Sequence, residues 1–138
     1  MKKILILIFT IGIFSNCSNG DNDSTNNEII GEWKLIAARI IDFSTNPMID
    51  YSDENIVYDF QANGILTVTG GNNVGYSNGD YEYIFGEDYL GGAPSPGEVM
   101  ILLVKVNNST KWTYNLTNGQ MTLGNSYVDG PDLIFERK

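Results

Sequence analysis

The sequence has no histidine, a single cysteine and few basic residues, and each shortage excludes a class of function. Without histidine, neither a Ser-His-Asp nor a Cys-His catalytic unit can form from these residues. One cysteine excludes an internal disulfide and any zinc site with several cysteine ligands. Eight Lys and Arg stand against 17 Asp and Glu, a formal net charge of -9. We therefore expect no nucleic-acid partner, because phosphate binding needs a basic surface.

Long apolar runs are also scarce, and the most continuous one lies at the N-terminus. Met1-Lys2-Lys3 is followed by an apolar stretch from Ile4 to Phe14. A basic start and about a dozen apolar residues are typical of a secretory signal, and the run is shorter than the roughly 20 residues of a membrane-spanning helix. We expect residues 1–16 to be a signal peptide that is not part of the folded domain.

The only cysteine, Cys17, lies directly behind this run. The arrangement resembles a bacterial lipoprotein signal, although Phe14 stands where Leu is usual and Asn16 where Gly, Ala or Ser is usual. In that family the cysteine becomes the lipidated first residue of the mature protein. The resemblance implies a lipid on Cys17 and an outer-membrane lipoprotein of the cell envelope, facing the periplasm or the outside. An ordinary signal followed by an incidental cysteine is the alternative.

The segment after Cys17 is polar as far as Glu28, so residues 17–28 are expected to form a lipidated flexible tether. Its Asp and Asn content suggests a calcium loop. A loop counted from Asp21 would need Gly at its sixth position, where Asn26 stands. We expect no metal site and no cofactor.

Residues 29–138 alternate between β-rich runs and turn residues, with no sustained helical period, which predicts one all-β domain. The expected strands number eight. They are Trp33–Phe43, Asn55–Phe60, Ile65–Thr69, Asp80–Phe85, Glu98–Val106, Lys111–Thr117, Gln120–Leu123 and Asp132–Arg137.

Short connections favour antiparallel pairing of consecutive strands. Asn63-Gly64 and Asn118-Gly119 both suit two-residue hairpin turns. A series of eight strands leaves two exposed edges unless the sheet closes. We expect an eight-stranded antiparallel up-and-down barrel; a two-sheet β-sandwich is the alternative. The run Val99–Val104 is apolar on both faces, so that strand needs cover inside and outside.

Gly31-x-Trp33 at the start of the first strand resembles the signature of the lipocalins, and more narrowly of small lipocalin-like domains behind bacterial lipoprotein signals. The resemblance implies that Gly31 allows a tight turn at the barrel floor and that Trp33 closes the floor. It also implies that Arg137, in the last strand, packs over the indole, with a cation–π energy of about 0.5–2 kcal/mol. No Thr-Asp-Tyr motif and no disulfide pair accompany the match.

These features favour a non-enzymatic binding module for a small apolar or amphipathic ligand. The candidate lining consists of apolar side chains that alternate along the strands: Tyr58, Phe60, Leu66, Trp112, Tyr114 and Met121. The same residues would equally form a filled core. In that alternative the protein is an interaction or structural lipoprotein that binds an envelope protein or glycan through loops such as Gly86–Gly97. No spacing of acidic residues selects a catalytic pair, so we expect no enzyme activity.

Overall fold

The computed structural model describes residues 26–42, 45, 47–71, 74–91 and 94–138. The predicted signal peptide, the predicted lipidation site Cys17 and the predicted tether as far as residue 25 lie outside the described residues. The described elements are α1 (Asn26–Ile29), β1 (Gly31–Arg39), β2 (Met48–Asp50), β3 (Val57–Phe60), β4 (Ile65–Thr69), β5 (Gly79–Asp88), β6 (Ile101–Val106), β7 (Thr110–Thr117), β8 (Gln120–Gly124), the 3-10 helix η1 (Ser126–Val128) and β9 (Asp132–Arg137).

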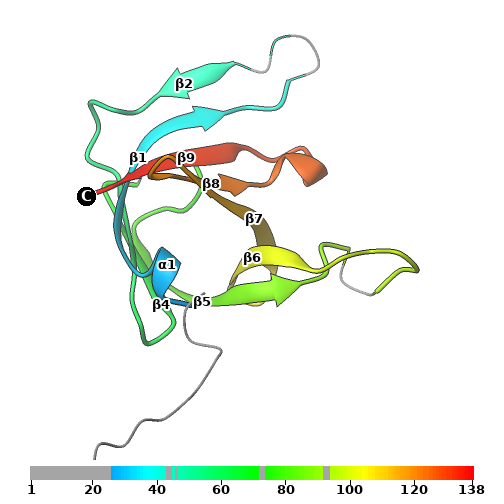
Figure 1. Cartoon of the computed structure of the whole chain (residues 1–138). Helices are drawn as coiled ribbons and strands as arrows, with labels where there is room; N and C mark the ends of the chain where they lie inside the picture. Colours follow the sequence, from blue (N-terminus) through cyan, green and yellow to red (C-terminus); the bar gives the residue numbers. More distant parts are fainter. Residues whose placement is uncertain (1–25, 43–44, 46, 72–73, 92–93) are drawn as a thin grey trace, which may run out of the picture.

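Strands β1 and β3 to β9 form a closed antiparallel barrel (Figure 1). From β3 onward each strand pairs with the next, β1 pairs with β3, and β9 returns to pair with β1. In β1, Trp33 lies opposite Tyr58 on one side and Arg137 on the other. The predicted eight-stranded up-and-down barrel, consistent with a lipocalin-like fold, is therefore confirmed, and the β-sandwich alternative is wrong.

The ninth strand, β2, was not expected. The sequence predicted one strand from Trp33 to Phe43, but β1 ends at Arg39 and the chain turns back as β2. The three residues of β2 pair with Ala37, Ala38 and Arg39, beyond the part of β1 that pairs with β3. This short strand lies outside the barrel ring (Figure 1), and all its residues are exposed.

The two asparagine-glycine turns differ. Asn118 and Gly119 both have positive φ, 53° and 80°, and they join Thr117 to Gln120 as the predicted two-residue hairpin. At the other turn only Gly64 has a positive φ, of 83°, and the N–H of Gln61 donates to the carbonyl of Ile65. The expected two-residue turn at Asn63-Gly64 is wrong, because the loop contains one residue more.

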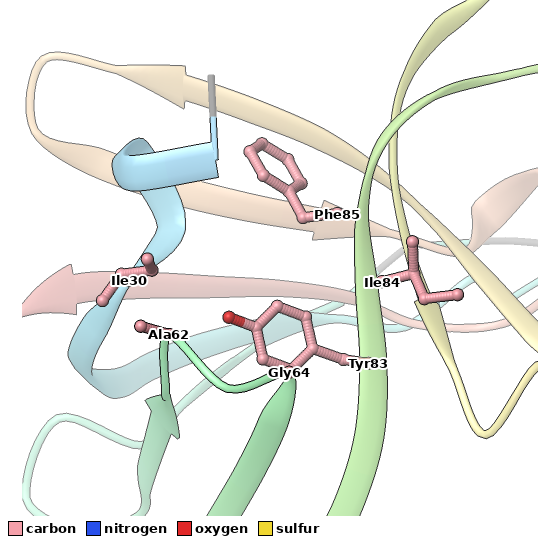
Figure 2. A pocket seen from close by; sticks show the side chains of 6 residues that line it. All are labelled: Ile30, Ala62, Gly64, Tyr83, Ile84 and Phe85. Atoms are coloured by element: carbon pink, nitrogen blue, oxygen red, sulfur yellow. The ribbon is translucent and has the colours of Figure 1, made fainter. Parts of the chain in front are cut away.

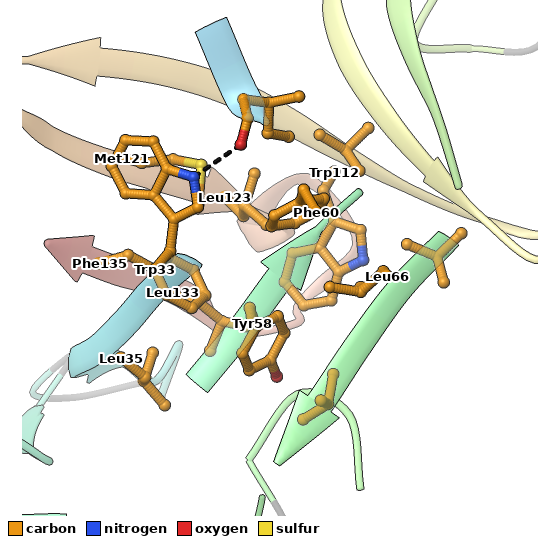
Figure 3. Close-up of a cluster of buried hydrophobic side chains, with 14 of the residues drawn as sticks. Trp33, Leu35, Tyr58, Phe60, Leu66, Trp112, Met121, Leu123, Leu133 and Phe135 are labelled. Carbon is orange, nitrogen blue, oxygen red and sulfur yellow. Dashed lines mark hydrogen bonds between the residues drawn. The ribbon is translucent and has the colours of Figure 1, made fainter. Parts of the chain in front are cut away.

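Apolar side chains from the barrel strands fill the interior (Figure 3). The aromatic rings meet edge to face: Tyr58 and Phe135 have centroids 4.9 Å apart, and Phe60 and Tyr83 are 5.1 Å apart. This arrangement adds about 0.5–1.5 kcal/mol per pair to the burial of apolar area. The alternation read from the sequence is confirmed, since Tyr58, Phe60, Leu66 and Val68 all lie in this core.

Strand β6 is buried on both faces, as its composition predicted. Val104 lies opposite Phe85 and points inward, whereas Leu103 lies opposite Gly86 on the outer face and is nevertheless 1% exposed. The strand begins at Ile101 rather than at Glu98, however. Val99 and Met100 precede it and are 73% and 52% exposed.

An ion-pair cluster ties the start of the β5–β6 loop to the outer face of the barrel. The carboxylate of Asp88 lies 3.1 Å from Lys105 Nζ and 3.3 Å from Lys111 Nζ. Hydrogen bonds from Lys105, from the N–H of Tyr89 and from Lys111 lower the pKa of Asp88 to about 2. Lys111 Nζ also donates to the carbonyl of Tyr89, 2.5 Å away. The loop expected at Gly86–Gly97 starts later than predicted, because β5 continues to Asp88.

One end of the barrel is closed by α1, Trp33 and Arg137. Trp33 Nε1 donates to the carbonyl of Ile29 at 2.7 Å, and Arg137 Cζ lies 4.3 Å from the centre of the indole ring. Arg137 also donates to the carbonyls of Glu28 and Ile30 at 2.8 and 3.0 Å. Its guanidinium thereby holds α1 across the barrel end while it stacks on the indole.

Gly31 belongs to the same closure. Its φ is +123°, and a Cβ there would lie 3.0 Å from Arg137 Nη1. The positive φ and the close approach of the guanidinium both favour glycine. The structure thus brings together the three residues that the resemblance assigns to the barrel floor.

Truncation of Trp33 tests this closure. Trp33→Ala should lower the free energy of unfolding by about 3–5 kcal/mol, because it removes a buried indole that supports α1 and Arg137. Trp33→Phe should lose clearly less, since a ring remains. Urea titration followed by circular dichroism measures both, with Lys138→Ala at an exposed ion pair as the control. A loss below about 1 kcal/mol for Trp33→Ala would show that the indole does not support the barrel end.

Candidate functional site

The barrel end opposite to α1, the mouth, is formed by the β4–β5, β6–β7 and β8–β9 connections. Antiparallel order places these connections where β9 begins, away from Arg137 at its end. The β4–β5 loop folds back over the mouth: the N–H of Tyr76 donates to Tyr58 Oη at 2.9 Å. Gly75, with φ of +75°, makes this approach possible, because a Cβ there would lie 2.5 Å from Tyr58 Oη and 2.8 Å from Leu133 Cδ1.

Two depressions open on the barrel. The one at the mouth has a volume of about 320 Å³, and the other has a volume of about 260 Å³. The mouth depression is lined by Gly75, Tyr76, Thr110, Trp112, Asn125 and Pro131. Trp112 Nε1 donates to Tyr76 Oη at 3.0 Å, so the indole and the phenol form one aromatic wall. Thr110 and Asn125 add a hydroxyl and an amide on the same rim.

The smaller depression lies near the end closed by α1 (Figure 2). Ile30 and Ala62 form one side, and Tyr83, Ile84 and Phe85 on β5 form the other, with Gly64 between them. Tyr83 Oη donates to the carbonyl of Gln61 at 2.8 Å, which joins β5 to the β3–β4 turn at this point. Its lining combines apolar side chains with exposed backbone and the Tyr83 phenol, and Tyr83 and Phe85 also belong to the core.

The six residues predicted to line a ligand cavity divide into two groups. Tyr58, Phe60, Leu66 and Met121 are completely enclosed in the core, where they pack against other side chains. The other two are closer to the depressions. Trp112 borders the mouth depression, and Tyr114 packs edge to face on Phe85, 4.7 Å between centroids, behind the smaller depression.

Sequence reasoning missed the loop residues of the mouth. Tyr76 follows no strand pattern in the sequence, but it is partly buried and packs against the core, with its ring centroid 4.9 Å from that of Tyr81. Asn125 and Pro131 follow β8 and carry no alternation signal. An aromatic residue directly after Gly75 was the one available sign that this loop approaches the barrel.

Two phenols sit in low-polarity surroundings. Burial raises the pKa of Tyr58 to about 12, against a lowering effect of the Tyr76 N–H. Burial, reinforced by Glu28 and opposed by Arg137, raises the pKa of Tyr114 to about 12. Both hydroxyls are therefore harder to ionise than the hydroxyl of an exposed tyrosine. Tyr114 Oη and Asn125 Oδ1 are buried atoms without a hydrogen-bond partner in the described part of the chain.

The described residues contain no cluster of three or more cysteine or carboxylate side chains that could hold a metal ion. Among the helices within the same ranges, none is long and apolar enough to cross a membrane. The arrangement at the mouth is suited to contact with a small amphipathic surface, through an aromatic wall and two neutral polar groups.

Comparison of the chain with protein-family models, with curated proteins and with solved structures finds no match. What the protein binds is therefore inferred from the barrel and from the two depressions described above.

The raised pKa of Tyr58 predicts a loss of stability at high pH. The unfolded chain releases this proton near pH 10, whereas the folded protein keeps it to about pH 12. The stabilisation is complete below pH 10 and is lost as the pH rises toward 12, at about 1.4 kcal/mol per pH unit. Tyr58→Phe should remove this part of the decline, although at pH 7 it should lose about 1 kcal/mol because the Tyr76 N–H loses its acceptor.

Urea titrations of both proteins between pH 8 and 11.5 measure the difference, and lysine deprotonation affects the two equally. An equal slope above pH 10 for the variant and the parent would contradict the burial of the Tyr58 hydroxyl.

Proposed function

We propose that the protein is a lipid-anchored, lipocalin-like protein of the cell envelope that binds a small amphipathic ligand at the mouth of its barrel. The observation that supports this proposal is the lining of the mouth depression. It combines an aromatic wall of Trp112 and Tyr76 with the polar rim residues Thr110 and Asn125. The filled interior argues against binding deep inside, where core side chains occupy the space.

The size of the depression limits the ligand. A volume of about 320 Å³ lies at the lower end of small-molecule sites, which range from about 300 to 1,000 Å³. An apolar ring or short alkyl portion fits against the aromatic wall, and one hydroxyl or amide of the ligand fits the rim. Aromatic side chains also stack on the apolar faces of sugar rings, so a glycan end belongs to the same chemical class.

The proposal contains no reaction. None of the six lining residues is a carboxylate, a lysine or a thiol, so the depression offers no acid–base pair and no activated nucleophile. The sequence pattern at Cys17 supports attachment to the outer membrane through a lipid, and an acidic protein needs such an anchor because anionic membrane surfaces repel it.

The second candidate is an interaction protein with a filled barrel that binds a protein through its loops. The exposed side chains of Val99 and Met100 before β6 favour this candidate, because neighbouring exposed apolar residues are typical of interaction sites.

A fluorescent probe tests binding at the mouth. N-phenyl-1-naphthylamine, a neutral amphipathic dye, should bind with a rise in fluorescence. Thr110→Tyr, which fills the depression from its partly buried rim, should weaken binding about tenfold. Ala62→Tyr fills the smaller depression and is the matched control, with unchanged affinity expected. Absence of binding, or equal weakening by both variants, would contradict a ligand site at the mouth.

Lipidation is tested on the full chain expressed in a bacterium that processes lipoproteins. The intact mass should correspond to residues 17–138 with a diacyl or triacyl modification on Cys17, and the protein should fractionate with membranes. Cys17→Ser should remove both properties. A free thiol at Cys17 in the parent protein would contradict the anchor.

A further inference from the structure

Tyr58 was expected to line a ligand cavity, but the structure places it in the core, one hydrogen bond away from the mouth depression. The residue is completely buried in β3, and its ring packs edge to face on Phe135. Its hydroxyl accepts a hydrogen bond from the N–H of Tyr76, a residue that lines the depression. Tyr58 therefore contacts the wall of the depression from behind.

The mouth depression is built from two parts of the chain. The β4–β5 connection supplies Gly75 and Tyr76, and the other four lining residues come from β7 and from the β8–β9 connection. The bond from Trp112 Nε1 to Tyr76 Oη joins the two parts. The aromatic wall therefore exists only while residues 75–77, which we call the mouth segment, lie against the barrel.

Two tyrosine hydroxyls hold the backbone of the mouth segment. Tyr58 Oη accepts from the N–H of Tyr76 at 2.9 Å, and Tyr81 Oη donates to the carbonyl of Ser77, also at 2.9 Å. The bond to Tyr58 is partly buried, whereas the bond from Tyr81 is exposed. Hydrogen bonds are stronger in surroundings of low polarity, so we expect Tyr58 to contribute more of the attachment.

Gly75 is fitted to the same contact. A Cβ at this position would lie 2.5 Å from Tyr58 Oη and 2.8 Å from Leu133 Cδ1. Leu133 is completely buried, and a packed core cannot make room at little cost. A side chain at Gly75 would therefore move the mouth segment away from the barrel rather than displace the core.

We propose that Tyr58 is a positioning residue of the mouth, whose hydroxyl holds the mouth segment against the barrel so that Tyr76 and Trp112 form the wall that the ligand contacts. This inference rests on the proposed ligand site and assigns part of its affinity to a residue outside it. A ligand that needs the assembled wall binds in proportion to the fraction of molecules that have it. Because coupling is reciprocal, a bound ligand also stabilises the bond to Tyr58.

Binding of N-phenyl-1-naphthylamine to matched hydroxyl deletions tests the proposal. Tyr58→Phe keeps the ring and removes the acceptor, so the affinity should fall about fivefold. Tyr83→Phe is the control, because it removes a core tyrosine hydroxyl that donates to the carbonyl of Gln61 at the smaller depression. Its affinity should equal that of the parent. Unchanged affinity of Tyr58→Phe, or an equal loss in Tyr83→Phe, would overturn the proposal.

A double variant tests whether the contact with the mouth segment is the cause. Gly75→Ala should weaken dye binding at least about tenfold, because the new Cβ and the positive φ both oppose the attachment. Tyr58→Phe should add no further loss in the Gly75→Ala background, since both changes act on one contact. Losses that multiply in the double variant would contradict this cause and overturn the proposal.

Deuterium exchange of the indole N–H protons, followed by nuclear magnetic resonance, tests the positioning role without a ligand. The chain has two tryptophans, and Trp33, whose N–H is bonded at the closed end, is the internal reference. In Tyr58→Phe the indole N–H of Trp112 should exchange about fivefold faster, while that of Trp33 is unchanged. Equal exchange of Trp112 in parent and variant, or equal acceleration of both indoles, would overturn the positioning role.

The two measurements distinguish this proposal from the ligand site on which it rests. If the parent binds the dye and Tyr58→Phe binds it equally well, the site stands and the positioning role fails. If the parent does not bind the dye, the ligand site is contradicted, and the exchange rates alone decide whether Tyr58 positions the wall.

Discussion

The pairing of β1 with β9, with Arg137 stacked on Trp33 at its end, is the interaction on which the barrel depends. A meander of eight strands has two free edges, and this pairing removes both of them. It also brings Arg137 to the carbonyls before β1, which holds α1 across one end. The core inside is enclosed because the sheet closes, so the burial of Phe60, Phe135 and their neighbours follows from this contact.

We propose binding at the rim because bulky side chains occupy the barrel interior. An eight-stranded barrel is wide enough either to be filled or to hold one small ligand. Here the inward-facing aromatic residues fill it, and the two depressions lie at its ends. At the mouth, Gly75 lets a loop reach Tyr58 and bring Tyr76 beside Trp112. The mouth depression, where we propose that a ligand binds, therefore lies at the barrel end opposite to α1.

Much of the fold was predictable because its elements obey local rules. Alternation along β7 identified Trp112 and Tyr114 as inward-facing, and Asn118-Gly119 supplied the positive φ values of a tight hairpin. The errors lie in segments whose position depends on contacts between residues far apart in the sequence. Strand β2 has only three residues, all exposed, and exists because β1 extends past β3. Tyr76 was unpredictable as a mouth residue, since its position depends on a bond to Tyr58, 18 residues away in the sequence. Strand β5 also extends past its pairing with β4, and composition does not reveal such a difference in strand length.

The most direct test of this account is a nuclear Overhauser spectrum of the folded domain in solution, examined for contacts between its first and last strands. The bond from the Lys138 N–H to the carbonyl of Glu32 makes Leu35 and Phe135 a pair without mutual hydrogen bonds, whose Hα atoms lie close together. The account predicts a strong Hα–Hα cross-peak between Leu35 and Phe135, beside those of the consecutive hairpins. Hairpin cross-peaks without any contact between β1 and β9 would contradict a closed barrel.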